Sequence, residues 1–299
     1  MPELPDIVVY VENLQSRIVG RTVKQIRLLN PFLLRTATPP IAAVQGRKIV
    51  GVQRLGKRIL IETEGRLFLV FHLMIAGRLR WFDNKAKIPG RIALAVFEFE
   101  NGTLVLTEAG TKRRASLHLV EGESAAHALH AGGLDILQSD FATFRQRLLA
   151  QSHTLKRALT DPHIFSGIGN AYSDEILHRA RLSPVALTGK LGDEELKRLY
   201  EAARSTLLDW TDRLRRLAAG NFPENVTAFR EDMAVHGRYG KPCPRCAAPV
   251  QRIVYARNEA NYCAPCQTGG RLLADRALSR LLREDWPKTL EALEQAKRR

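Results

Sequence analysis

The sequence contains the stretch Cys243-Pro-Arg-Cys246 and, after residues 247 to 262, the stretch Cys263-Ala-Pro-Cys266, and these hold all four of its cysteines. Each C-x-x-C knuckle supplies two thiolates, and two knuckles at this spacing predict a tetrahedral zinc site. Four thiolates fill the coordination shell, so the single Zn²⁺ would be structural and would hold a short hairpin. Two disulfides are the alternative, but a chain of 299 residues needs no such staples.

The region before the cysteines has helical periodicity. One apolar face of a long helix is formed by Leu196, Leu199, Tyr200, Ala203, Leu207, Trp210 and Leu214. Further upstream, Phe165-Ser-Gly-Ile-Gly-Asn170 lies between helices, and its two glycines permit a tight turn. The amides at the start of the next helix would then point outward as an anion site, although a plain interhelical turn remains the alternative. Periodicity fades from 221 to 241, which predicts a long loop before the hairpin.

The N-terminal part begins with a helix and continues as a β structure. Ile7, Val11, Leu14 and Ile18 have helical spacing, so the helix starts almost at the first residue. From about 22 to 120 the chain consists of short β-rich runs separated by glycines, at 48–55, 58–62, 66–73, 93–99 and 103–107. This texture predicts an antiparallel sandwich or barrel.

Together these patterns predict an α+β multidomain chain. We expect an N-terminal antiparallel β-sandwich with its helix at 1–120, a linker at 121–133, a helical domain at 134–230 and a zinc finger at 231–266. A tail follows at 267–299. Its leucines at 272, 273, 278 and 281 favour helix, and its last three residues, 297–299, are expected to be disordered.

The charge predicts the kind of partner. The formal net charge is +15, and residues 47 to 114 carry fourteen basic and six acidic side chains. A polyanion, and above all a nucleic acid, would bind mainly there. An anionic membrane surface is the competing interpretation, but no basic amphipathic helix supports it. No stretch reaches the ~18 apolar residues of a membrane helix, and no signal peptide is recognisable, so we expect a cytoplasmic protein that acts on the nucleoid.

Several motifs resemble the formamidopyrimidine-DNA glycosylase and endonuclease VIII family, closer to its formamidopyrimidine-DNA glycosylase branch. The resemblance covers nearly the whole chain, and its motifs occur in the family's order and spacing. They are Met1-Pro-Glu-Leu-Pro-Asp-Ile7, Lys57 in a hairpin, His72-Leu-Met-Ile-Ala-Gly77, Ser166-Gly-Ile-Gly-Asn-Ala-Tyr-Ser-Asp-Glu175, His236-Gly-Arg238 and the two cysteine pairs. The resemblance implies that the helical domain is a helix-two-turn-helix domain. It also implies a monomeric DNA glycosylase and AP lyase of base excision repair that removes oxidised bases from damaged double-stranded DNA.

The resemblance implies a catalytic group at the start of the chain. After removal of Met1, Pro2 would present a secondary amine, and an α-amino group titrates near ~8, so part of it is neutral and nucleophilic at neutral pH. Glu3 is the candidate acid beside it. Lys57, in a tight turn, is the third catalytic candidate. Asp6, near the helix start, is interpreted as mainly structural.

Other residues are assigned to DNA by the resemblance. His72, Asn170 and Arg238 match residues that hold phosphates, and their alternatives are a strand histidine, a helix cap and a solvated arginine. The family's zinc-hairpin arginine falls at Asn258, while Arg257 stands one residue earlier, and a one-residue shift reverses the face of a strand. Either a bulge in the hairpin restores Arg257, or Arg252 or another basic group makes the contact.

The same alignment concerns the gap that a flipped nucleotide leaves in the duplex. Ile75 aligns with the residue that intercalates into this gap. In the alternative interpretation, Met74 is the intercalating residue and Ile75 is a core strand residue. Arg113 and Arg114 align with the second loop, where Ala115 replaces an aromatic residue. The smaller wedge predicts relaxed preference for the opposite base.

Two other classes of function remain open. One is a damage-binding protein that keeps the fold without turnover, and the other is a basic zinc protein that binds RNA or ribosomes.

Overall fold

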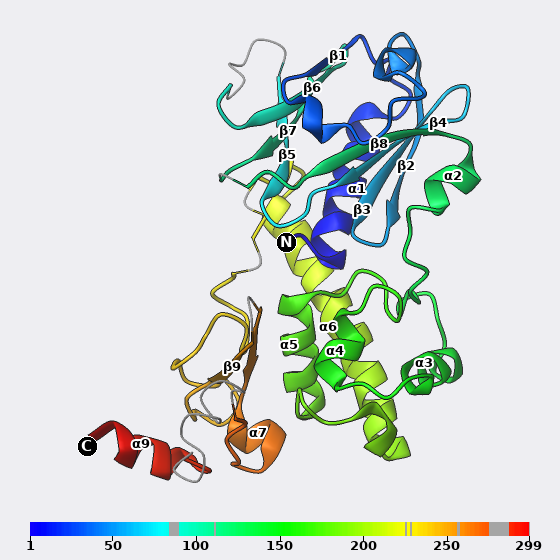
Figure 1. Cartoon of the computed structure of the whole chain (residues 1–299). Helices are drawn as coiled ribbons and strands as arrows, with labels where there is room; N and C mark the ends of the chain where they lie inside the picture. Colours follow the sequence, from blue (N-terminus) through cyan, green and yellow to red (C-terminus); the bar gives the residue numbers. More distant parts are fainter. Residues whose placement is uncertain are drawn as a thin grey trace. The chain divides into compact units, whose positions relative to one another are not determined.

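The structure is a computed structural model that describes residues 1–83, 90–110, 112–224, 226–227, 229–255, 258–274 and 287–298. The chain divides into two compact units, each described by itself. Unit 1 comprises residues 1–131 and 208–228, and unit 2 comprises residues 132–207 and 229–299 (Figure 1). None of the described helices is both long and apolar enough to cross a membrane.

Unit 1 is built from two antiparallel sheets of four strands each, as the predicted β-sandwich requires (Figure 1). The first sheet has the order β1 (Gln25–Leu28), β6 (Ala93–Glu98), β7 (Thr103–Glu108) and β5 (Gly77–Phe82). The second has the order β2 (Ile49–Leu55), β3 (Arg58–Thr63), β4 (Leu67–His72) and β8 (Ser116–Glu121). Short 3₁₀ turns, Pro31–Leu33 and Ile41–Val44, connect β1 to β2.

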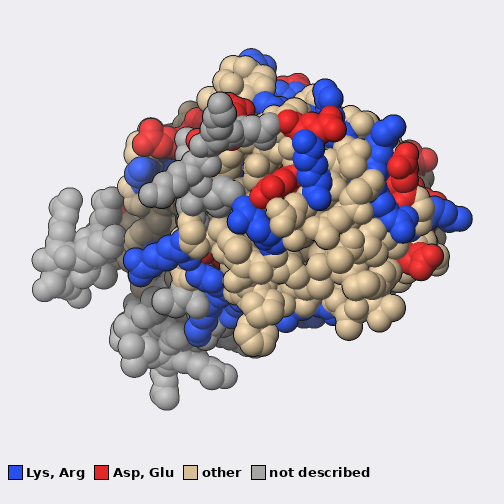
Figure 2. All heavy atoms as spheres, turned by 90° about the horizontal axis from the view of Figure 1, so that it is seen from above, with Lys and Arg blue, Asp and Glu red and all other residues tan. Residues whose placement is uncertain are grey.

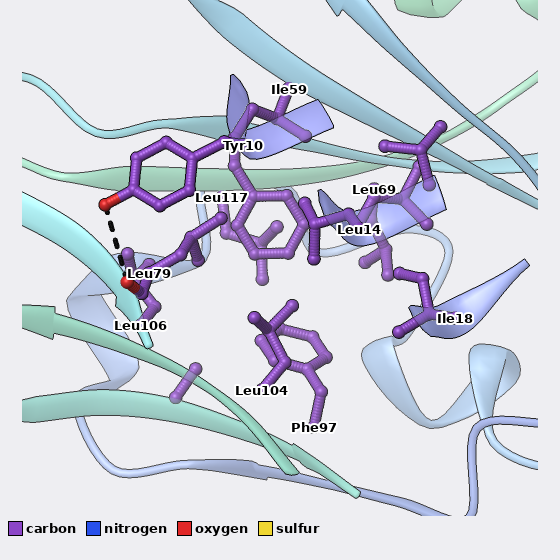
Figure 3. Packing of buried hydrophobic residues seen from close by; sticks show 14 of the residues in the cluster. Tyr10, Leu14, Ile18, Ile59, Leu69, Leu79, Phe97, Leu104, Leu106 and Leu117 are labelled. Carbon is purple, nitrogen blue, oxygen red and sulfur yellow. Dashed lines mark hydrogen bonds between the residues drawn. The ribbon is translucent and has the colours of Figure 1, made fainter. Parts of the chain in front are cut away.

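The core of unit 1 is organised around helix α1 (Leu4–Ile18). Its residues Tyr10 and Leu14 are fully buried among side chains from both sheets, and the Tyr10 hydroxyl donates to the carbonyl of Leu79 at 3.4 Å (Figure 3). Each large apolar side chain buried in this way stabilises the fold by about 1.5–3 kcal/mol. Phe222, from the part of unit 1 that follows the long helix, packs on Tyr10 with ring centroids 5.6 Å apart. The middle of α1 is therefore anchored in the core of unit 1.

Unit 2 contains the helices and the cysteine hairpin. The helices are α3 (Phe141–Leu149), α4 (Leu155–Thr160), α5 (Asn170–Ala180) and the first part of α6 (Asp193–Ala218), with a 3₁₀ turn at Thr188–Lys190. The hairpin consists of β9 (Gln251–Tyr255) and β10 (Asn258–Tyr262) and is followed by α7 (Ala264–Thr268) and α9 (Leu290–Arg298).

Some predicted elements need correction. The stretch 121–133 was expected to be a linker, but β8 extends to Glu121 and helix α2 (Glu123–His127) follows. The tail was expected to be helical around Leu272 and Leu273 and disordered at its end. Instead those leucines are buried in a non-helical segment, and Lys297 and Arg298 belong to α9, while residue 299 lies outside the described residues. Leu278 and Leu281 lie outside the described residues.

Candidate active site and nucleic-acid interface

The residues at the start of the chain are buried in unit 1. Pro2 is buried, and Glu3 is only 2% exposed. Glu3 precedes α1 as its cap and forms a capping box with Asp6, whose carboxylate accepts the Glu3 backbone N–H at 3.0 Å. Two reciprocal bonds of this kind satisfy amide groups that a helix end otherwise leaves open. Asp6 therefore has the structural role that the sequence predicted.

Lys57 lies at the tip of the hairpin between β2 and β3. The turn has two residues, and Gly56 adopts φ +64°, a conformation in which glycine is unstrained. Burial lowers the pKa of the Lys57 ammonium group, while the Glu3 carboxylate raises it. Glu3 is thus a charged neighbour of Lys57.

The chain-terminal amine has the same neighbour. Burial lowers the pKa of the Met1 amine, Arg78 and Lys57 lower it further, and Glu3 and Asp6 act in the opposite direction. Two amines with lowered pKa thus share one buried carboxylate, an arrangement that can supply a nucleophile and move protons.

His72 ends β4 directly opposite Arg58 on β3. Burial lowers the pKa of His72 to about 4, and the cations Arg58 and Lys57 contribute. The half-buried imidazole is therefore neutral at pH 7, with ring nitrogens available for hydrogen bonding. His72 is the last residue of β4, so the structure places it in a strand, and its role as a phosphate contact stays a prediction.

The two candidate DNA loops of unit 1 are exposed. Ile75 is 59% exposed and lies between β4 and β5, so it is not a core strand residue. Arg113 and Arg114 are also exposed. The loop is held by the buried carboxylate of Glu108, which accepts the backbone N–H of Arg114 at 2.9 Å and that of Ala115 at 3.0 Å. Ala115 is only 4% exposed, so the position aligned with an aromatic wedge belongs to the core here.

Asn170 is the first residue of α5, and its cap is Gly169. The Asn170 side chain is therefore not the helix cap that was its alternative interpretation. Its backbone carbonyl accepts a hydrogen bond from the Lys156 ammonium group at 2.7 Å. Lys156 also forms a 2.5 Å ion pair with Asp174, one turn further along α5. Lys156 of α4 therefore holds the first turn of α5 in place.

Two acidic residues of α5 bind the segment that precedes the cysteines. Asp174 accepts from the His236 imidazole at 2.8 Å and from the Asn261 amide at 3.4 Å. Glu175 accepts the backbone N–H groups of residues 234, 235 and 236 at 2.7, 2.9 and 3.0 Å. These buried bonds join α5 to the cysteine region. Sequence reasoning missed them, although Asp174 and Glu175 belong to a motif it had singled out.

Arg238 has a more defined environment than a solvated arginine. It is half-buried, and its guanidinium donates to the carbonyl oxygens of Glu231 at 2.7 Å and Pro242 at 3.3 Å. These bonds fix the direction of the Arg238 side chain. Both acceptors are neutral carbonyl groups, so they do not neutralise its positive charge.

The four cysteines converge as the spacing predicted. The sulfur atoms of Cys243, Cys246, Cys263 and Cys266 all lie within 4.8 Å of one another, and those of Cys246 and Cys263 are 3.3 Å apart. Zinc bound by four thiolates at ~2.3 Å needs a cluster of this size. Burial raises the pKa of Cys266 to about 11, so a cation is needed to hold it as a thiolate at pH 7. The donor set therefore fits Zn²⁺.

A histidine reaches this cluster from α5. The imidazole of the buried His178 lies 3.2 Å from the sulfur of Cys243. Hydrogen bonds from neighbouring groups orient metal ligands in this manner. Sequence reasoning missed this contact, because the two residues are 65 positions apart.

The predicted hairpin arginine, Arg257, lies outside the described residues. The two strands pair in continuous register from Tyr255 opposite Asn258 to Gln251 opposite Tyr262, so the described part of the hairpin has no bulge. Arg252, the other candidate, pairs with Glu259 at 3.3 Å and lies over the Tyr239 ring at 4.3 Å.

One face of the molecule shows how its basic and acidic side chains are distributed. On the face seen in Figure 2, basic and acidic side chains are interspersed around a broad area that carries neither. The excess positive charge is not gathered there as one continuous patch, so particular cationic clusters become important for any polyanion.

Comparison with known proteins identifies close relatives. The family described as formamidopyrimidine-DNA glycosylase N-terminal domain matches residues 1–115, and the formamidopyrimidine-DNA glycosylase H2TH domain matches residues 133–211. The formamidopyrimidine-DNA glycosylase of Heliobacterium modesticaldum is 32% identical over 282 residues, which cover 89% of this chain and all of that protein.

Solved structures agree with the fold. The crystal structure of the MutM (Fpg) protein from Thermus thermophilus has a TM-score of 0.73 and 30% identity, with 89% of this chain and 98% of that chain covered. A complex of Lactococcus lactis Fpg with DNA that contains an oxidised pyrimidine has a TM-score of 0.79 at 24% identity, with 89% of this chain and 100% of that chain covered.

Proposed function

The chain belongs to the formamidopyrimidine-DNA glycosylase family, and from this membership we propose that it is a bifunctional DNA glycosylase and AP lyase of base excision repair. The membership confirms the resemblance found in the sequence. Its substrate is double-stranded DNA with oxidised bases of the formamidopyrimidine and 8-oxoguanine type. The enzyme acts as a monomer in the cytoplasm, on DNA of the nucleoid.

Pro2 is the nucleophile of this proposal. Once Met1 is removed, the Pro2 nitrogen attacks C1′ of the damaged nucleotide, the glycosidic bond breaks, and the base leaves with the bonding electrons and a proton. The amine loses its own proton, the C1′–O4′ bond then breaks as O4′ takes up a proton, and an iminium with an opened sugar results. The iminium acidifies the neighbouring C2′–H, so loss of that proton expels the 3′ phosphate and a second elimination expels the 5′ phosphate.

Glu3 and Lys57 assist the nucleophile. Glu3 supplies the proton for the sugar ring oxygen or the departing base. Lys57 reaches the phosphate or the opened sugar from its hairpin tip. The single observation that carries the proposal is that residues 1–115, which include Pro2, Glu3 and Lys57, match the formamidopyrimidine-DNA glycosylase N-terminal domain. The burial of Glu3 at the start of the chain supports it.

The remaining residues hold the DNA. His72, Asn170 and Arg238 contact phosphates around the flipped nucleotide. Ile75 fills the gap, with Arg113 or Arg114 on the opposite base and Arg257 on the zinc hairpin. One Zn²⁺ on the four cysteines stabilises that hairpin and takes no part in the chemistry.

Borohydride trapping tests this mechanism. A duplex with 8-oxoguanine should form a reducible adduct with the protein, and Pro2→Gly or a retained Met1 should weaken adduct formation. Pro5→Ala, in the same segment but without a reacting amine, is the matched control and should trap normally. Absence of an adduct under any condition would overturn the mechanism.

The same samples separate the rival functions. Lesion binding without strand nicking would favour a damage-binding protein, and preference for RNA over lesion DNA would favour an RNA-binding zinc protein.

A further inference from the structure

The two faces of the sheet β2-β3-β4-β8 have different environments. Successive strand residues point to opposite faces, so one set of side chains enters the core of unit 1. These are Ile59, Ile61, Leu69, Phe71, Leu117 and Leu119. On the other face, Leu60, Phe68 and Val70 form a small apolar cluster with Ala126 of α2. The apolar half of that outer face is therefore covered.

The other half of the outer face is basic. Arg58 is directly opposite His72, and His72 is directly opposite Ser116. His118 follows two residues along β8 on the same face. Directly paired residues have side chains about 5 Å apart at their base, so the three strands bring these groups together. The Arg35 backbone N–H donates to the carbonyl of Leu117 at 2.8 Å, which places Arg35 beside His118.

The cations of this cluster disfavour the charged form of its histidines. Burial lowers the pKa of His118, and Arg58 and Arg35 lower it further. The same is true of His72, with Arg58, Lys57 and His118 as the contributing groups. Among the described residues, no carboxylate shifts the pKa of either histidine. Arg58 Nε and His118 Nδ1 are shielded from solvent, and neither has a hydrogen-bond partner in the part of the chain that is described.

Such an arrangement is costly for an isolated protein. A buried donor without a partner costs about 1–3 kcal/mol, and neighbouring like charges add to the cost. An anion that accepts from these nitrogens would remove both costs together. A phosphodiester group carries one negative charge and oxygen acceptors for several donors, which matches two guanidinium groups and two imidazoles.

We propose that Arg58, His118 and Arg35 form, beside His72, a site for a further backbone phosphate of the bound DNA. The proposal rests on the proposed function, because it takes DNA as the ligand. Lys57 and His72 lie at one end of this cluster, so the DNA strand that reaches them continues across the outer face of β4 and β8. The added site lengthens the contact with the phosphate backbone and reads no base.

Binding assays test the site without relying on excision. The protein binds a duplex that carries a tetrahydrofuran abasic analogue, and fluorescence anisotropy gives the affinity between about 50 and about 200 mM salt. Arg58→Gln and His118→Gln should each weaken binding by about tenfold, the effect of one charged hydrogen bond. For Arg58→Gln the slope of log affinity against log salt should fall by about 0.9. Arg27→Gln, an exposed arginine paired with Glu98 on the other sheet, is the control and should match the wild type.

Thermal unfolding distinguishes binding from a structural role. Arg58→Gln removes a cation from a repelling cluster, so its melting temperature should equal or exceed that of the wild type. A lower melting temperature with an unchanged salt slope would overturn the proposal, and so would a loss of affinity for an RNA stem-loop but not for DNA. If the predicted slopes appear but no borohydride adduct forms, the phosphate site stands and the proposed function fails.

Discussion

Two clusters of buried charge in this molecule differ in how completely they are paired. In unit 2, Asp174 and Glu175 of α5 each accept hydrogen bonds from three donors. In unit 1, Arg58 and His118 keep shielded nitrogens without partners among the described residues. Charges that are paired inside a protein serve its own fold, whereas a shielded donor without a partner carries a cost that a bound acceptor would remove. The contrast separates groups that bond within the protein from the groups that we propose as a phosphate site.

The largest expected effect is that of removing the metal from unit 2. Cys266→Ser should release the zinc and abolish DNA binding, since structural zinc supplies roughly 10–16 kcal/mol in zinc-finger peptides. Zinc content, circular dichroism and anisotropy measure the change, and the helices of unit 2 should stay folded. His178→Ala, which removes the contact to Cys243, should keep one zinc per chain but release it about 10–100-fold more readily to a chelator. Normal nicking of lesion DNA by metal-free protein would contradict the role of the hairpin.

Asp174→Ala should have the next largest effect. The substitution leaves the Lys156 ammonium group buried without its ion-pair partner, so the free energy of unfolding should fall by about 3–5 kcal/mol. Denaturant titration measures this fall. Asp212→Ala removes an ion pair whose carboxylate is 55% exposed, and should cost only about 0–1 kcal/mol. Equal losses in the two variants would break the comparison.

Lowering the pH should have a smaller effect, on the stability that the basic cluster of unit 1 contributes. His72 has a pKa of about 4 in the folded protein against 6.5 normally, so the unfolded chain binds a proton in this window that the folded chain does not. The stability that His72 contributes is therefore complete above pH 6.5 and is lost as the pH falls toward 4. Thermal unfolding across this range should show a smaller decline in His72→Gln than in the wild type. The control is His127→Gln, which replaces an exposed histidine of α2. An identical decline in stability in the wild type and both variants would refute the lowered pKa of His72.

The sequence predicted the elements that have a strong local pattern. The N-terminal helix, the long helix containing Leu196 and Leu214, and the cysteine cluster are confirmed. Strands β1, β5 and β8 were not predicted. β1 has only four residues, and β5 and β8 place polar residues between their apolar positions, so none of them resembles a continuously apolar strand.

The contacts between distant residues could not be predicted in the same way. Asp174 and His236 are 62 residues apart, and nothing in the spacing of either indicates the other. The basic cluster of the outer face has the same origin. Arg58 and His118 become neighbours of His72 only when β3, β4 and β8 pair in one particular register.

The two-residue turn at Gly56 and Lys57 limits how this enzyme can be altered. Leu55 pairs directly with Arg58, so every residue of the turn is committed to the connection. A single inserted or deleted residue would force a bulge or shift β3 by one position, which would exchange the core face of β3 with the face that carries Arg58. Protein engineers and natural lineages can therefore exchange side chains at this loop, but its length is fixed.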